Sequence, residues 1–142
     1  MTVSAILENK DTNTVCLSST ATLADICAVL TKNRIGTVLI VDDGKLTGIV
    51  SERDVVRILA ASGAEALADT AQNCMTKKLV TCTRNDTVIH IMERMTTGRF
   101  RHIPIVENGN LLGIISIGDV VKYRMAEVER EAQEIRDYIA TT

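Results

Sequence analysis

The chain has 142 residues and a formal net charge of −2, with its basic and acidic residues interspersed. A chain of this length can bury about two thirds of its unfolded surface in a core, and without a basic face it is unsuited to binding nucleic acid. No apolar run approaches the roughly 18 residues of a membrane span and no signal peptide is evident, so we expect a cytoplasmic protein with no membrane partner.

The elements of the first half follow from hydrophobic periodicity. Residues 1–14 are polar beyond position 6 and form a lead-in. Apolar residues at three- and four-residue spacing predict a helix over 22–33. Two β-branched runs, 37–41 and 46–50, flank a turn that contains Gly44, which predicts a hairpin.

The next helix runs to Gly63, and the alanine-rich stretch 64–73 predicts a short helical linker. The remainder repeats the plan of the first half, with a strand at 80–82, a helix at 86–97, strands at 103–106 and 111–115, and a helix from 117 to about 139.

This similarity of plan is a sequence duplication. Residues 15–59 align with 80–124 without a gap, and 15 of these 45 positions are identical. Units of this size are too small to bury separate cores, so we expect each to complete the other. The chain therefore divides into a lead-in (1–14), repeat 1 (15–62), a linker (63–79), repeat 2 (80–124) and a C-terminal helix extension (125–142).

The most informative motif is G-h-x-S-x-x-D, in which h is apolar. It places Ser51 before Asp54, and Ser116 before Asp119, where an apolar strand passes into a helix. Ser-x-x-Asp resembles a helix capping box, which needs no ligand. The same hydroxyl, carboxylate and free helix amides can also form a binding edge. Both interpretations stay open, because one set of residues can do both.

The last helix carries an apolar stripe that needs a partner surface. The stripe can pack on its own domain, on a second copy of the chain or on a foreign protein; its members are Val121, Met125, Val128, Ala132, Ile135 and Ile139.

The spacings of the four cysteines, Cys16, Cys27, Cys74 and Cys82, fit neither a zinc ribbon nor a C-x-x-C motif. We expect reduced thiols that fill the core, and whether they add a redox input stays open. Aromatic residues make up only 2% of the chain, so a planar ligand would lie mostly between aliphatic side chains.

With these motifs in place, the chain resembles the tandem cystathionine-β-synthase (CBS) domain pair, or Bateman module, of the stand-alone bacterial type. The resemblance rests on S-E-R-D at 51–54, Met75-Thr76, G-R-F-R-H-I-P-I-V at 98–106 and S-I-G-D-V-V-K at 116–122. It implies an α/β (α+β) fold of two β-α-β-β-α repeats about a pseudo-twofold axis, with an extended C-terminal helix.

The resemblance also implies a function. By this resemblance, we expect a non-catalytic regulatory module that binds AMP, NAD(H), ATP or ADP in two clefts and senses energy or redox metabolites. They commonly associate as a homodimeric disc, and the regulated protein stays unknown. The alternatives are a ligand-free dimerisation or interaction module and an S-adenosylmethionine sensor.

In the family the helix-opening aspartate accepts hydrogen bonds from both ribose hydroxyls, and each cleft draws on both repeats. The resemblance thus implies a first cleft formed by Ile49, Ser51, Arg53, Asp54, Val80, Phe100, Arg101, His102 and Ile103. It implies a second cleft formed by Lys10, Val15, Ile35, Gly36, Thr37, Val38, Ile114, Ser116 and Asp119.

The two clefts differ in charge. Repeat 2 has Phe-Arg-His at 100–102 where repeat 1 has Ile-Gly-Thr at 35–37, and Glu52-Arg53 of repeat 1 corresponds to Ile-Gly in repeat 2. We hypothesise that the cationic first cleft holds the more highly charged phosphate group. The second would hold an adenosine moiety with room for an extension, such as a dinucleotide.

Nothing in the sequence indicates catalysis. His90 and His102 have no serine or cysteine at a spacing that suggests a catalytic pair. The chain contains neither a phosphate-binding loop of the Walker type nor a cluster of metal ligands. We therefore expect a binding protein that is not an enzyme and requires no metal.

Overall fold

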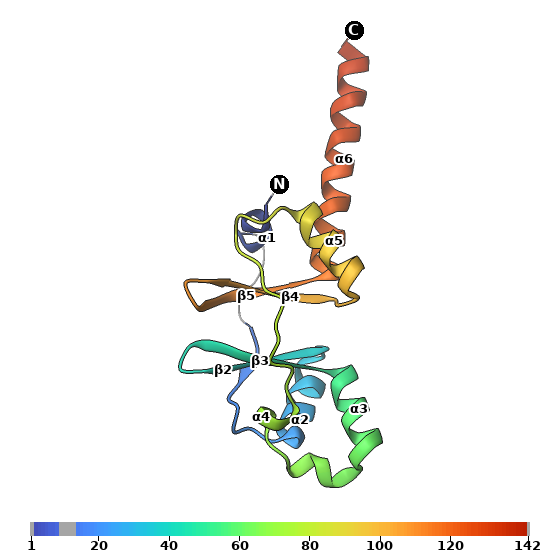
Figure 1. The fold of residues 1–142 in the computed structure, drawn as a ribbon. Helices are drawn as coiled ribbons and strands as arrows, with labels where there is room; N and C mark the ends of the chain where they lie inside the picture. The colour runs from blue at the N-terminus through green and yellow to red at the C-terminus, as the bar shows by residue number, and fades with distance from the viewer. Residues whose placement is uncertain (1, 9–13, 142) are drawn as a thin grey trace.

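The computed structural model describes residues 2–8 and 14–141 and has the mixed α/β fold expected from the sequence. The elements are α1 (Val3–Glu8), β1 (Cys16–Leu17), α2 (Leu23–Asn33), β2 (Thr37–Asp42), β3 (Lys45–Ser51), α3 (Glu52–Ser62), the 3-10 helix η1 (Ala64–Ala68), α4 (Ala71–Cys74), α5 (Val88–Gly98), β4 (His102–Glu107), β5 (Asn110–Ser116) and α6 (Ile117–Thr141). Figure 1 shows two hairpins, one from each repeat, with helices on their outer sides.

The two predicted hairpins are confirmed. β2 pairs with β3 and β4 pairs with β5, both antiparallel. Both residues of each turn have positive φ: Asp43 and Gly44 in repeat 1, Asn108 and Gly109 in repeat 2. A two-residue turn with this backbone matches the twist of the flanking strands. The sheet order is β1-β2-β3-β5-β4.

Equivalent residues of the repeats are 65 positions apart, because residue 15 aligns with residue 80. Lys45 pairs with Asn110, its own equivalent, where β3 meets β5. Thr37 Oγ1 lies 3.1 Å from Nδ1 of His102, which is again its equivalent. Contacts between equivalent residues place the pseudo-twofold axis between the repeats, as the sequence resemblance implies.

Each repeat is completed by a segment from outside its own 45 residues. α1 packs into the core of repeat 2, where Val3 is fully buried and its N–H donates to the carbonyl of Asp86 at 2.9 Å. α4 packs on repeat 1, and the N–H of Ala71 donates to the carbonyl of Ala21 at 2.7 Å. The expected lead-in therefore contains a helix that packs on repeat 2, although repeat 1 follows it directly in the sequence (Figure 1).

The helix ends follow the capping signals of the sequence. Thr22 and Asp25 form a complete capping box at α2, as do Ser51 and Asp54 at α3. The predicted helix at 22–33 and the predicted end near Gly63 are confirmed, since α2 ends at Asn33 and Gly63 caps α3.

Two expectations need correction. The strand predicted at 80–82 is reduced to a single bridge between Cys82 and Ile105, because only Cys82 exchanges backbone hydrogen bonds with β4. The cysteines were all expected in the core, but Cys16 is exposed, whereas Cys74 and Cys82 are buried. Among the described residues no helix combines the length and apolar character needed to cross a membrane.

Candidate functional site

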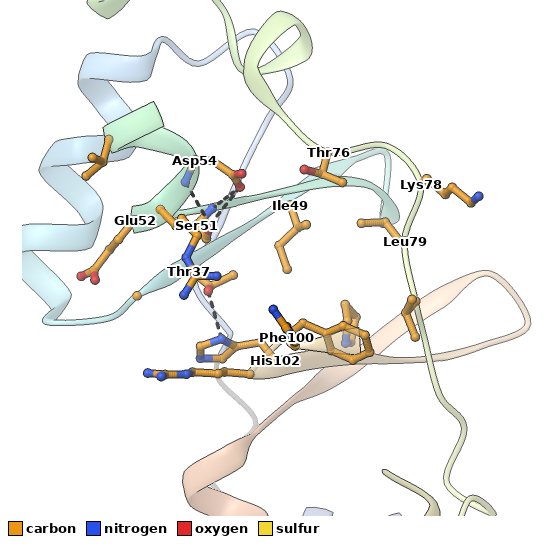
Figure 2. Close-up of a pocket in the computed structure, with 17 residues that line it drawn as sticks. Thr37, Ile49, Ser51, Glu52, Asp54, Thr76, Lys78, Leu79, Phe100 and His102 are labelled. Atoms are coloured by element: carbon orange, nitrogen blue, oxygen red, sulfur yellow. Dashed lines mark hydrogen bonds between the residues drawn. The ribbon is translucent and has the colours of Figure 1, made fainter. Parts of the chain in front are cut away.

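A cavity of about 740 Å³ opens between the two repeats, beside the point where β3 passes into α3 (Figure 2). This volume lies within the range of small-molecule sites. The lining comes from both repeats and from the linker between them: Gly36, Thr37, Ile49, Ser51, Glu52, Arg53, Asp54, Val56, Thr76, Lys78, Leu79, Val80, Arg99, Phe100, Arg101, His102 and Pro104.

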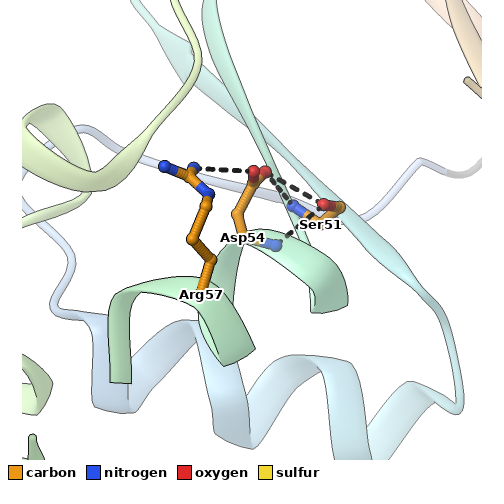
Figure 3. Close-up of polar contacts among 3 residues, drawn as sticks. All are labelled: Ser51, Asp54 and Arg57. Atoms are coloured by element: carbon orange, nitrogen blue, oxygen red, sulfur yellow. Dashed lines mark hydrogen bonds and ion pairs between the residues drawn. The ribbon is translucent and has the colours of Figure 1, made fainter. Parts of the chain in front are cut away.

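Asp54 holds the start of α3. Its Oδ2 accepts hydrogen bonds from the backbone N–H and the hydroxyl of Ser51, both at 2.9 Å, and its own N–H donates to Ser51 Oγ at 3.2 Å. Oδ1 accepts from a terminal nitrogen of Arg57 at 3.1 Å (Figure 3). The capping interpretation is therefore confirmed for this motif, and the same carboxylate borders the cavity.

The linker forms one wall because it is fixed to the edge of β3. Ile49 and Thr76 exchange two backbone hydrogen bonds, at 3.1 and 2.9 Å. Gly48 permits this approach: a Cβ there would lie 2.3 Å from Sδ and 2.9 Å from Cβ of Met75. The glycine before the serine motif thus allows the linker to lie against the strand.

The cavity has more basic than acidic side chains. Its basic side chains come from Arg53 in repeat 1, Lys78 in the linker, and Arg99 and Arg101 in repeat 2. Glu52 and Asp54 are its acidic members. This excess of guanidinium and ammonium groups favours an anionic ligand, since such groups bind phosphate and carboxylate through charge-assisted hydrogen bonds.

Part of the cavity lining is apolar. Figure 2 shows the Ile49 side chain pointing from β3 towards Phe100, with Leu79 of the linker beside them. The Phe100 ring lies against the end of α5, where a Cβ on Gly98 would come within 2.0 Å of the ring. A flat ligand therefore meets aliphatic side chains and one aromatic ring, while its polar end can reach Asp54 and the cations.

Most of the residues expected in the first cleft are brought together here. Ile103 is the exception, because it alternates with His102 and Pro104 along β4 and is fully buried in the core of repeat 2. The sequence did not predict the wall residues of the linker (Thr76, Lys78 and Leu79) or of β4 (Pro104). Met75-Thr76 was noted as a motif, but nothing local to it indicates a wall.

The second set of residues includes the other copy of the serine–aspartate motif. Asp119 caps α6 as Asp54 caps α3, with Ser116 N donating to its Oδ2 at 2.9 Å. Val15, Ile35 and Ile114 are partly buried. Lys10 lies outside the described residues.

Three other members of the second set lie at the Asp54 cavity or in a core. Gly36 and Thr37 line the Asp54 cavity, because they lie beside the pseudo-twofold axis, where Thr37 contacts His102. Val38 is fully buried in the core of repeat 1, since its side chain points to the helix side of β2.

A polar contact beside the cavity joins the two repeats. The contact between Thr37 and His102 joins a hydroxyl to an imidazole, and Thr37 is buried. Within residues 2–8 and 14–141, no three His, Cys, Asp or Glu side chains gather where they could hold a metal ion.

The comparisons with known proteins agree with this fold. The CBS domain model matches residues 3–61 and again residues 71–126. The chain is 31% identical over 147 residues to the mitochondrial CBS domain-containing protein CBSX3 of Arabidopsis thaliana, an alignment that covers 97% of this chain and 71% of the relative. It spans about a fifth of the length of several longer curated relatives that it also matches.

Two solved structures are similar in both sequence and fold. A CBS-domain containing protein of Agrobacterium tumefaciens is 42% identical with a TM-score of 0.83, covering 87% of this chain and 99% of its own. A CBS domain protein of Pyrobaculum aerophilum, complexed with AMP, is 28% identical with a TM-score of 0.74, covering 84% of this chain and 89% of its own. The two model matches, the sequence relatives and the shared fold together show that the chain belongs to the CBS domain family, as a tandem pair.

Proposed function

We propose that this protein is a non-catalytic regulatory module that binds an adenine nucleotide in the Asp54 cavity. The observation that carries the proposal is the composition of that cavity: a carboxylate at a helix start, an apolar wall and an excess of basic side chains. The AMP complex of the P. aerophilum relative supports the same ligand class.

Each part of a nucleotide has a matching group. The base would lie between Ile49, Leu79 and Phe100, which offer an apolar surface and one ring. The ribose hydroxyls would donate to Asp54, as a vicinal diol suits a carboxylate with two acceptor oxygens. The phosphates would face Arg99 and Arg101.

The present contacts of Asp54 set a condition on this arrangement. A carboxylate offers about four lone-pair positions, and three are taken by two groups of Ser51 and one of Arg57. Two ribose hydroxyls therefore need one of these donors to move. Arg57 can do so, because its side chain is 67% exposed and the ion pair is weak in solvent.

The charge of the cavity also separates candidate ligands. S-adenosylmethionine carries a sulfonium, which the arginines would repel, whereas AMP, ADP, ATP and NAD(H) carry phosphates. We infer that a phosphorylated adenosine is the preferred ligand of the Asp54 cavity. We further propose that Asp119 marks a second, less cationic cleft that accepts an adenosine moiety with a longer extension, such as that of NAD(H).

In the proposed role the protein acts by population shift. A nucleotide that contacts both repeats and the linker favours the arrangement in which those three walls are closest, by its difference in affinity between arrangements. We propose that the protein works in the cytoplasm as a homodimer and reports this shift to a regulated protein.

The test is a thermal-shift titration with AMP, ADP, ATP, NAD, NADH and S-adenosylmethionine. A nucleotide that binds the folded state raises the unfolding temperature in proportion to the logarithm of its excess over Kd. Asp54→Ala should remove most of the response to AMP. Asp25→Ala is the matched control, because Asp25 forms the same kind of capping box at α2 and does not line the cavity.

Both variants lose a helix cap, so both should unfold at lower temperature without ligand. Only Asp54→Ala should also lose the AMP response. An equal AMP-induced shift in the two variants would exclude Asp54 as a nucleotide-binding residue. No response of the wild-type protein to any of the compounds would favour the alternative of a ligand-free dimerisation module.

A further inference from the structure

The C-terminal helix presents an exposed apolar stripe over its whole length. Its large members are between 47% and 67% exposed: Val121, Met125, Val128, Ile135 and Ile139. Figure 1 shows the C-terminal part of α6 extending well beyond both hairpins and their helices. A stripe of this kind on a soluble protein marks an interaction surface.

The spacing of the stripe is that of a coiled coil. With Ala132 included, the members are separated by 4, 3, 4, 3 and 4 residues, so the pattern repeats every seven residues. Met125, Ala132 and Ile139 then occupy the a positions of a heptad, and Val121, Val128 and Ile135 the d positions. A strict heptad keeps its stripe on one face only when two helices supercoil around each other.

The charges beside the stripe favour one of the two possible orientations, parallel or antiparallel, of paired α6 helices from two copies of the chain. In a parallel pair each g residue faces the e residue five positions later in the other helix. Arg124 would face Glu129 of the second copy, and Glu131 would face Arg136. Both contacts join opposite charges, and twofold symmetry makes each of them twice.

An antiparallel pair would be repulsive. Aligning every a layer with a d layer brings position 121 opposite 139, 125 opposite 135 and 128 opposite 132. Glu129 would then face Glu129 of the second copy, Glu131 would face Glu131 of the second copy, and Lys122 would face Arg136 of the second copy. All three contacts join like charges, so the stripe specifies the parallel orientation.

We propose that two copies of this chain associate through a parallel, two-stranded coiled coil of α6 over residues 121–139. The helix is already anchored at its start, where Val120 is buried and Tyr123 packs against the core of repeat 2. Anchoring lowers the cost of ordering the helix on association. Arg124, which donates to Glu127 at 2.6 Å, retains further N–H groups for the second copy.

The proposal deepens the proposed homodimer by naming its surface and orientation. A parallel α6 pair has its twofold axis along the helices, so repeat 2 of one copy lies next to repeat 2 of the other. It does not depend on nucleotide binding, and its failure leaves the thermal-shift test of the Asp54 cavity unaffected.

The first experiment measures the mass of the full-length protein by sedimentation equilibrium over a range of concentrations. Ile135→Glu puts a charge at a d position and should raise the dimer Kd at least tenfold. Ala140→Glu adds the same charge on the b face, outside the stripe, and should leave Kd unchanged. Ile135 is exposed, so neither variant should alter the far-ultraviolet circular dichroism.

The second experiment determines the orientation. With Cys16 replaced by serine, Ile135→Cys should form an intermolecular disulfide on mild oxidation, because equivalent d positions lie side by side in a parallel pair. An antiparallel pair would instead cross-link only when Met125→Cys is added. Cross-linking only with both cysteines would overturn the proposal, and so would a monomeric wild type. A dimer unaffected by Ile135→Glu would also overturn it and would leave a homodimer that uses another surface.

Discussion

The two repeats share a backbone and differ in the side chains that it carries. Arg34 and Arg99 are equivalent, and both adopt left-handed φ values, 53° and 56°. Equivalent backbone bonds tie each helix start to the preceding strand entrance: Glu52 N to the carbonyl of Gly36 at 2.9 Å, and Ile117 N to that of Arg101 at 2.8 Å. The duplicated geometry therefore survives where the residues have diverged.

The difference between the repeats lies in what surrounds this shared backbone. Repeat 1 receives the linker along β3, and repeat 2 receives α1 over its core. The strand entrance of repeat 2 carries Arg101 and His102 where repeat 1 carries Gly36 and Thr37. The comparison teaches that the duplication provides two similar scaffolds, and that the additions and substitutions make the Asp54 cavity cationic.

The largest expected effect concerns the thiol of Cys82, which occupies the position of Leu17 in repeat 1. Burial raises the pKa of Cys82 from 9.0 to about 12, with Asp86 adding to the shift. At pH 8 its thiolate fraction should be about a thousandfold lower than that of an unperturbed thiol. Alkylation followed by mass spectrometry should therefore modify the exposed Cys16 long before Cys82.

The same pKa has a consequence for stability. Because the folded pKa is raised, the contribution of Cys82 is fully present below pH 9 and is lost as the pH rises towards 12. Cys82→Ala should remove this alkaline component of the unfolding curve. Rapid alkylation of Cys82 in the native protein at pH 8 would show that repeat 2 opens readily.

A second comparison uses the two cores. Ile26 and Ile91 are equivalent, and each is fully buried in the core of its own repeat. Ile→Ala at either position should lower the free energy of unfolding by about 2–5 kcal/mol. Because each repeat is completed by an outside segment, urea denaturation should give one transition in both variants. Separate transitions for the repeats would show that each folds without the other.

A third comparison uses the equivalent glycines Gly48 and Gly113. A Cβ at Gly48 would meet Met75, including its Cβ at 2.9 Å, whereas a Cβ at Gly113 would come no closer than 3.3 Å, to the end of the Leu7 side chain. Gly48→Ala should cost about 1–3 kcal/mol, as expected for overpacking. Gly113→Ala should cost less than about 1 kcal/mol, because a flexible leucine can move. Equal costs in urea denaturation would contradict the role assigned to the linker contact.

What the sequence predicted correctly was local or duplicated. Hairpins, helix caps and the long last helix follow from short-range patterns, and Ser51 and Asp54 were found because their motif occurs twice. The destination of α1 and the walls formed by Lys78 and Pro104 were not predicted, since they depend on packing between distant segments. That Gly36 and Thr37 line the Asp54 cavity was not predicted for the same reason: residues beside a symmetry axis can face either side.

The smallest expected effect tests the helix caps. Thr22 and Asp25 form a complete capping box at α2, but the equivalent pair at α5 is Thr87 and His90, where only the His90 N–H to Thr87 hydroxyl bond is present, at 3.1 Å. His90→Asp should complete the box and place a negative charge at the helix start, raising the free energy of unfolding by about 0.5 kcal/mol. Asp25→His should lower it by a similar amount. If both substitutions change stability in the same direction, the caps are not equivalent despite their shared backbone. The bridge between Thr87 and Thr2, the residue before α1, would then be the difference to examine.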